Sequence, residues 1–191
     1  MKMYITMGIF SILHAIFPIG IGYALLMLFF VKLGIRQKPK RSICFCEYVY
    51  LLYIWVVLDI TGIIGMQFNL QWFVNSFRSL GLYLPTGKGD LMMLTLNLAL
   101  FIPLGLLTPY IFSKHINTLK RVALSLMLFS VCIEVVQMFG GRSFELNDII
   151  MNTLGSVLGY VFYKVIKKLT YISIFDSCKR TKRDCCKMTK K

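Results

Sequence analysis

The chain has 191 residues, of which 57% are hydrophobic and 16% are charged, and its formal net charge is +14. Soluble domains are about half apolar and about a quarter charged, so this composition excludes an ordinary soluble domain and indicates a membrane protein. The basic excess could also serve nucleic-acid binding, but its distribution along the chain favours a role in membrane orientation, and we expect no nucleic-acid partner.

Five separate apolar runs follow one another along the chain. Each has at least the roughly 17–25 residues that cross a bilayer as a helix. We therefore expect an all-α fold: a polytopic membrane protein with a bundle of about five transmembrane helices. The first run is too long for the apolar region of a signal peptide, so we expect it to be retained. The runs are Tyr4–Val31, Ile43–Phe68, Leu91–Phe112, Val122–Phe139 and Ile149–Ile166.

The basic residues are distributed unevenly between the connections of these runs. If the runs cross the membrane in turn, eighteen of the 22 Lys and Arg residues fall on one side. That side holds the connection after Val31, the connection after Phe112 and the C-terminal tail. Because short cytoplasmic connections are enriched in Lys and Arg, we expect the N-terminus outside and the C-terminus inside.

The expected organisation has four parts. Residues 1–68 form two transmembrane helices joined by a basic cytoplasmic loop, and residues 69–90 form an extracytoplasmic interfacial loop with Trp72 and Tyr83 at head-group level. Residues 91–168 form a three-helix core, and residues 169–191 form a basic, disordered cytoplasmic tail. The three cysteines of the tail lack the paired spacing of a zinc site and have no His nearby, so we expect no metal and no cofactor.

Polar side chains recur at one depth in the last three runs. Asn97 lies six residues into the third run, roughly 9 Å below the outer surface at 1.5 Å per residue. Glu134 and Gln137 lie on one face near the outer end of the fourth run, and Asn152 follows Asp148 by one turn in the fifth. Because polar groups in hydrocarbon are costly, this shared layer predicts a site open to the outer leaflet.

Simpler roles compete with this interpretation. Asp148 is well placed to cap the N-terminus of the fifth helix, and Asn97 and Asn152 could be hydrogen-bonding contacts between helices. Gly155 and Gly159 form the small-residue pattern that lets helices approach closely, so we expect a packing role for them.

Ionisable groups within the runs leave further alternatives open. Glu134 is either paired with Arg142, two turns further on, or held neutral by protonation. His14 and Asp59 lie near mid-membrane in the first two runs, where a buried pair between them is possible on depth alone.

Four short motifs within 91–163 resemble the signature of the VanZ-like family. They are Asn97 with Phe101-Ile-Pro-Leu-Gly105, Ile133-Glu134-Val-Val-Gln137, Gly141-Arg142, and Asp148-Ile-Ile-Met-Asn152-Thr-Leu-Gly155. The family's namesake is associated with resistance to teicoplanin, a lipid-tailed glycopeptide antibiotic, without remodelling of the peptidoglycan precursor. The resemblance implies a multi-pass protein of the bacterial cytoplasmic membrane. It also implies that the functional positions are Asn97, Glu134, Gln137, Arg142, Asp148 and Asn152.

Depth and resemblance together suggest two functions. The first is binding of a lipid-linked ligand at the outer leaflet, either a lipoglycopeptide or a lipid-linked cell-wall precursor, with membrane lipids as the other partners. The alternative is an intramembrane enzyme that modifies a lipid or glycolipid head group by acid–base catalysis, with Glu134 and Asp148 as the carboxylate pair. We expect binding rather than catalysis, because the outer stretch has no His and no activated nucleophile.

Overall fold

The computed structural model describes the backbone of residues 2–34, 41–77 and 88–188, and the side chains of residues 6, 9–34, 41, 43–76 and 89–170. Every regular element in these ranges is a helix, as the sequence predicts. The six helices are α1 (Lys2–Lys32), α2 (Arg41–Ile60), α3 (Leu70–Phe77), α4 (Lys88–Ile111), α5 (Leu119–Met138) and α6 (Leu146–Met188).

Four of these helices contain segments long and apolar enough to cross a membrane. They expose large apolar side chains in the way that lipid-facing helices do: Phe10 and Phe17 of α1 are 63% and 76% exposed. Such surface is covered by acyl chains in a membrane and would be a liability in water. The fold is that of a polytopic helical membrane protein. The segments are Ile9–Lys32, Ile43–Ile60, Gly89–Ile111 and Leu146–Thr170.

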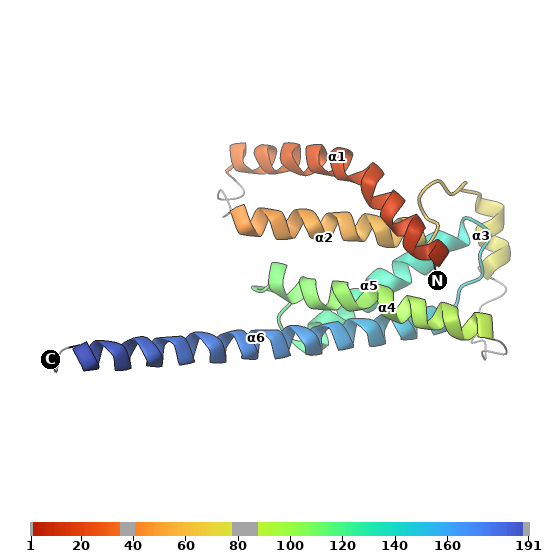
Figure 1. The fold of residues 1–191 in the computed structure, drawn as a ribbon. Coiled ribbons are helices and arrows are strands. Elements are labelled where there is room, and N and C mark those ends of the chain that lie inside the picture. Colours follow the sequence, from red (N-terminus) through yellow and green to blue (C-terminus); the bar gives the residue numbers. More distant parts are fainter. Residues whose placement is uncertain (1, 35–40, 78–87, 189–191) are drawn as a thin grey trace.

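The run 122–139 forms α5, which is not among these four segments. Lys120 and Arg121 lie in its first turn, and Glu134 and Gln137 are buried near its end. Figure 1 shows that α5 carries the chain back from the end of α4 to the start of α6. As a result α4 and α6 run in the same direction, and α5 packs against both as a more polar, partly interior element.

The helix ends sort into two groups at opposite ends of the bundle (Figure 1). One end holds the C-terminal end of α1, the start of α2, the connection between α4 and α5, and the far end of α6. Lys32, Arg41 and Lys120 belong to helix ends in this group. The other end holds the start of α1, the short helix α3 and the turn between α5 and α6. This grouping matches the two sides that the charge distribution separates, and we call them the basic end and the hairpin end.

The interfacial segment 69–90 contains α3, a helix that the sequence did not resolve within its apolar pattern. The Asn69 side chain accepts a hydrogen bond from the Gln71 backbone N–H at 2.8 Å, which caps the start of this helix. Phe73 stacks on Phe139 at the end of α5, with ring centroids 4.4 Å apart. Trp72 is 41% exposed, and the expected partner anchor Tyr83 lies outside the described residues.

Glycines bring α4 and α6 into direct backbone contact, which agrees with the packing role expected for them. A Cβ added at Gly155 would collide with the carbonyl oxygen of Leu98, and one added at Gly159 with that of Ile102. Gly105 faces the backbone of Ser156 in the same way. The spacing of four residues on both helices keeps the contact over more than a turn, so α4 and α6 form one closely packed parallel pair.

The helix α6 extends into the stretch 169–191 and continues as helix to Met188. After Gly159 the sequence contains neither glycine nor proline, and lysine and arginine are good helix formers. The helix therefore meets no residue that would stop it. Residues 189–191 lie outside the described part of the chain.

Tyrosine hydroxyls attach the N-terminal helix pair to this core. Tyr53 of α2 donates to the Leu100 carbonyl at 2.9 Å, and the Tyr50 hydroxyl lies 3.0 Å from the hydroxyl of buried Thr108. A cluster of buried apolar side chains from α2, α4, α5 and α6 lies beside these bonds. It consists of Val57, Phe101, Leu104, Val122, Leu126, Ile133 and Tyr160.

Candidate functional site

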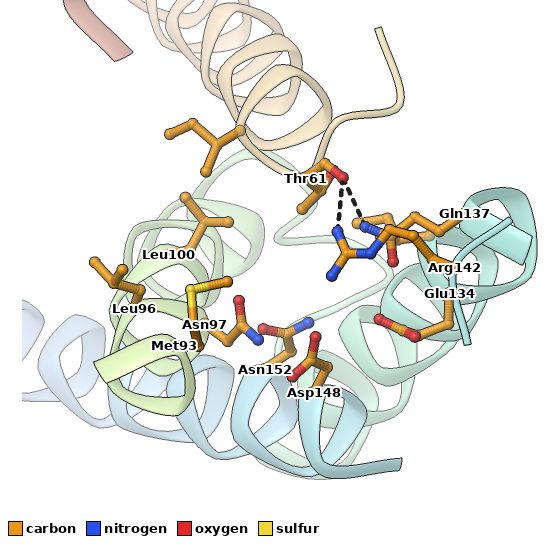
Figure 2. A pocket seen from close by; sticks show the side chains of 12 residues that line it. Thr61, Met93, Leu96, Asn97, Leu100, Glu134, Gln137, Arg142, Asp148 and Asn152 are labelled. Carbon is orange, nitrogen blue, oxygen red and sulfur yellow. Dashed lines mark hydrogen bonds between the residues drawn. The ribbon is translucent and has the colours of Figure 1, made fainter. Parts of the chain in front are cut away.

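A polar cavity of about 90 Å³ lies between α4, α5 and α6 and is closed on one side by the end of α2 (Figure 2). It would hold several waters or a small polar group, since one water needs roughly 10–15 Å³ of such volume. All six site residues predicted from the sequence line it. The lining residues are Ile60, Thr61, Met93, Leu96, Asn97, Leu100, Ile133, Glu134, Gln137, Arg142, Asp148 and Asn152.

The contact between α4 and α6 brings the first three polar groups together. Asn97 lies one residue before Leu98, whose carbonyl meets Gly155, so the close helix approach sets the position of its amide. Asn97 is a hydrogen-bond partner of the Asp148 carboxylate in the first turn of α6. In Figure 2 the Asn97, Asp148 and Asn152 side chains point toward one another from the two helices.

Asn152 is a deeply buried amide of the cavity, with 3% of its surface exposed. Its Nδ2 donates to the hydroxyl of fully buried Ser130 on α5 at 2.8 Å. Its Oδ1 is buried and has no hydrogen-bond partner among the described residues. A buried acceptor left without a donor is destabilising by about 1–3 kcal/mol, so the cavity side of Asn152 favours a group that can donate to it.

Glu134 is 2% exposed and projects from the last turns of α5. One carboxylate oxygen accepts the backbone N–H of Glu145 at 3.0 Å, directly before α6 begins. The N-terminal end of a helix carries a partial positive charge, which favours a carboxylate at this place. Glu134 therefore fixes the start of α6 while its side chain remains part of the cavity wall.

Gln137 and Arg142 converge on a single acceptor, the backbone carbonyl of Thr61 (Figure 2). Gln137 Nε2 donates to it at 2.7 Å and Arg142 Nη1 at 3.4 Å. Thr61 directly follows α2, and the last carbonyls of a helix lack partners within that helix. The two donors supply those partners, so Arg142 contacts the end of α2.

The turn after α5 places Arg142 at the rim of the cavity. Gly141 has φ +82°, a left-handed conformation that glycine adopts without strain, and the Arg142 N–H then returns to the Gln137 carbonyl at 3.3 Å. Gly140 packs against the side chain of Met66, and Gly141 lies beside the ring of Trp72. Arg142 is exposed, so its guanidinium can meet a group outside the cavity.

Two contributors were not predicted from the sequence. The Thr61 carbonyl is a backbone atom, so no side-chain pattern could reveal it; the signal would have been a helix end marked by Gly62, which has φ +76°. For Ser130, the only indication in the sequence of a role in the site is its position one helical turn before Glu134. The possible His14–Asp59 pair is not supported, because His14 is exposed on α1 and its Nδ1 lies 3.0 Å from the carbonyl of Phe10.

Comparison with known proteins places these residues in a family. The family model VanZ/LLP1 matches residues 17–167, which include α2, α3, α4, α5 and α6 up to residue 167. The chain belongs to the VanZ/LLP1 family. The matched region is therefore longer than the stretch 91–163 that carries the motifs. It also includes Thr61 at the end of α2.

A curated relative agrees with this assignment. Protein VanZ of Enterococcus faecium is 34% identical over 117 residues, which cover 60% of this chain and 68% of that protein. No solved structure matches the chain. As a member of the VanZ/LLP1 family, the chain is a membrane protein related to glycopeptide-resistance proteins.

Proposed function

We propose that this protein binds the polar head of a lipid-tailed ligand at the outer leaflet and thereby limits the access of lipoglycopeptide antibiotics such as teicoplanin to their target. The observation that carries this proposal is the cavity itself. Six polar side chains from three helices and one turn surround it, and the buried Oδ1 of Asn152 has no donor among the described residues. Ionisable and amide side chains are rare within membrane-spanning segments and commonly mark a binding site or a ligand pathway.

The size of the cavity limits what enters it. Sites for whole drug-sized ligands have volumes of roughly 300–1,000 Å³, several times the volume found here. We therefore propose that only a hydroxyl- or amine-bearing part of the head group enters, where Asn152, Glu134 and Asp148 accept its hydrogen bonds. Exposed Arg142 contacts an anionic group at the rim, and the lipid tail lies along the apolar surface of α4, where Leu91 is 61% exposed.

Placement at the outer leaflet rests on charge. The cavity is lined by Thr61 after the end of α2 and by Arg142 in the turn between α5 and α6, so it lies toward the hairpin end of the bundle. Basic connections, which lie at the opposite end, are typical of the cytoplasmic side. A lipid-tailed antibiotic reaches the membrane from outside. The cavity and the antibiotic therefore meet on the same side of the membrane.

Antibiotic susceptibility tests the proposal in a susceptible host that expresses the chain. Wild type is expected to protect against teicoplanin but less against a glycopeptide without a lipid tail. Glu134→Gln and Arg142→Ala should each abolish most of this protection. Glu145→Gln is the matched control, because it removes an acid close by whose side chain does not line the cavity. Unchanged protection by Glu134→Gln and Arg142→Ala, at equal protein levels in the membrane, would rule the proposal out.

One observation supports the alternative function, an intramembrane enzyme. Glu134 and Asp148 both line the cavity, and a carboxylate pair of this kind can accept a proton from a bound head group and return it to a leaving group. Incubation of the purified protein with labelled envelope lipids, followed by mass spectrometry, separates the two functions. A converted lipid that is absent with Asp148→Asn identifies an enzyme, whereas a binding protein returns every lipid unchanged.

A further inference from the structure

A second, larger hollow lies at the basic end of the bundle, far from the polar cavity along α4 and α6. It is a groove of about 710 Å³, within the range of roughly 300–1,000 Å³ that is usual for ligand sites. We call it the basic-end groove. It is lined by Cys46 from α2, by Leu106, Leu107, Tyr110 and Ser113 from α4 and the turn after it, and by Tyr163, Ile166, Lys167 and Thr170 from α6.

The groove lies at the level where the membrane-crossing segments end. The membrane-crossing segment of α4 ends at Ile111, and the groove is lined by Tyr110 just before this end and by Ser113 just after it. The segment of α6 ends at Thr170, which also lines the groove. Tyrosines are typical of this head-group level, and Tyr110, which is 54% exposed, lies there. Leu106 and Leu107 lie one turn deeper, so the groove is apolar inside and polar at its mouth.

The mouth of the groove is basic. The Lys167 ammonium lies 5.8 Å from the ring centroid of Tyr163, so a groove-lining tyrosine holds the cation beside the groove. Lys164 is held one turn earlier, 5.6 Å from the ring centroid of Tyr160. Glu47 follows the lining residue Cys46 in sequence, but its carboxylate accepts a hydrogen bond from Tyr23 of α1 at 2.8 Å. None of the groove-lining residues is acidic.

We propose that the basic-end groove binds an anionic phospholipid, with an acyl chain against Leu106 and Leu107 and the phosphate near Lys167. The apolar interior, the tyrosine level and the single sign of charge at the mouth each match one part of such a lipid. The hydroxyls of Ser113 and Thr170 can donate to the phosphate and glycerol oxygens. This site is separate from the polar cavity, and its lipid serves as a fixed part of the folded protein at its basic end.

Native mass spectrometry of the full chain tests this site. The protein is released from micelles that contain equal amounts of phosphatidylglycerol and phosphatidylcholine with identical acyl chains. Wild type is expected to retain phosphatidylglycerol in preference to phosphatidylcholine. Lys167→Gln should lower that preference roughly fivefold, the effect expected for one basic residue at an anionic lipid surface. Lys167→Arg keeps the cation and should keep the preference.

Two further variants separate a groove from general surface charge. Lys120→Gln removes one cation from the same end of the bundle but does not line the groove, so the lipid preference should stay within about twofold of wild type. Leu107→Trp fills the apolar interior and should reduce retention of both lipids. Equal retention of the two lipids by wild type, or equal losses in Lys167→Gln and Lys120→Gln, would overturn the proposal.

Discussion

At the scale of single residues, the site depends on hydrogen bonds of unequal strength. Gln137 and Arg142 share the Thr61 carbonyl, but the first bond is 2.7 Å long and comes from a side chain that is 3% exposed. The second is 3.4 Å long and exposed, close to the limit at which a hydrogen bond contributes anything. Gln137 should therefore hold α2 against α5, whereas Arg142 is left largely available for a ligand.

Gln137→Ala should lower the stability of the protein, while Arg142→Ala should leave it nearly unchanged. Loss of a hydrogen bond between helices in a membrane costs about 0.6 kcal/mol on average and at most about 1.7 kcal/mol. We expect about 1 kcal/mol for Gln137→Ala, because the orphaned acceptor is at a helix end, and less than about 0.5 kcal/mol for Arg142→Ala. Unfolding of the purified protein by a denaturing detergent measures both.

Thr61→Val is the control for this pair, because the acceptor is the backbone carbonyl and remains in place. Only the weaker bond from the Thr61 hydroxyl to the Leu58 carbonyl, 3.2 Å long, is lost. A larger destabilisation by Thr61→Val than by Gln137→Ala would show that the end of α2 is held by the threonine side chain.

At the scale of elements, the sequence predicted what hydrophobicity and periodicity encode. The apolar runs became α1, α2, α4 and α6 because a helix in lipid satisfies its own backbone groups. The position of α5 beside the parallel pair α4 and α6 depends on tertiary packing, which apolar length does not reveal. The continuation of α6 to Met188 went unpredicted because a basic, polar stretch is equally compatible with a solvated helix.

Gly159→Ala should separate α4 from α6 and destabilise the protein. The added methyl group would collide with the Ile102 carbonyl, a backbone atom that cannot turn aside, and overpacking of this kind costs typically about 1–3 kcal/mol. Gly22→Ala is the matched control, because nothing lies within 4 Å of the added atom in the middle of α1. Alanine is the better helix former, so that variant should be neutral or more stable.

Thermal unfolding in detergent measures both glycine variants, and the antibiotic test measures the consequence for the site. Because the α4–α6 contact sets the position of Asn97 against Asp148, Gly159→Ala should also reduce protection. Equal stability of the Gly159→Ala and Gly22→Ala proteins would show that the helix pair can relax at no cost, and that the glycines do not define the cavity.

At the scale of the whole molecule, the two hollows lie toward opposite ends and differ in chemistry. The polar layer of the first could be predicted because Asn97, Glu134, Gln137 and Asn152 are expensive in lipid and fall at one depth. The closure of this cavity by the end of α2 could not be predicted, because every residue has a backbone carbonyl and the sequence does not show which one faces the cavity. The basic-end groove was equally hidden, because its apolar lining is indistinguishable in sequence from lipid-facing surface.

The sidedness of the molecule is tested by cysteine labelling in intact cells, with the native cysteines replaced by serine. Arg142→Cys and Glu145→Cys at the hairpin end should react with a membrane-impermeant maleimide before lysis. Lys114→Cys, in the connection between α4 and α5, should react only after lysis. The reason is the concentration of Lys and Arg at the basic end, which the positive-inside rule assigns to the cytoplasm. Labelling of Arg142→Cys only after lysis would place the polar cavity toward the cytoplasm and remove the basis for antibiotic binding there.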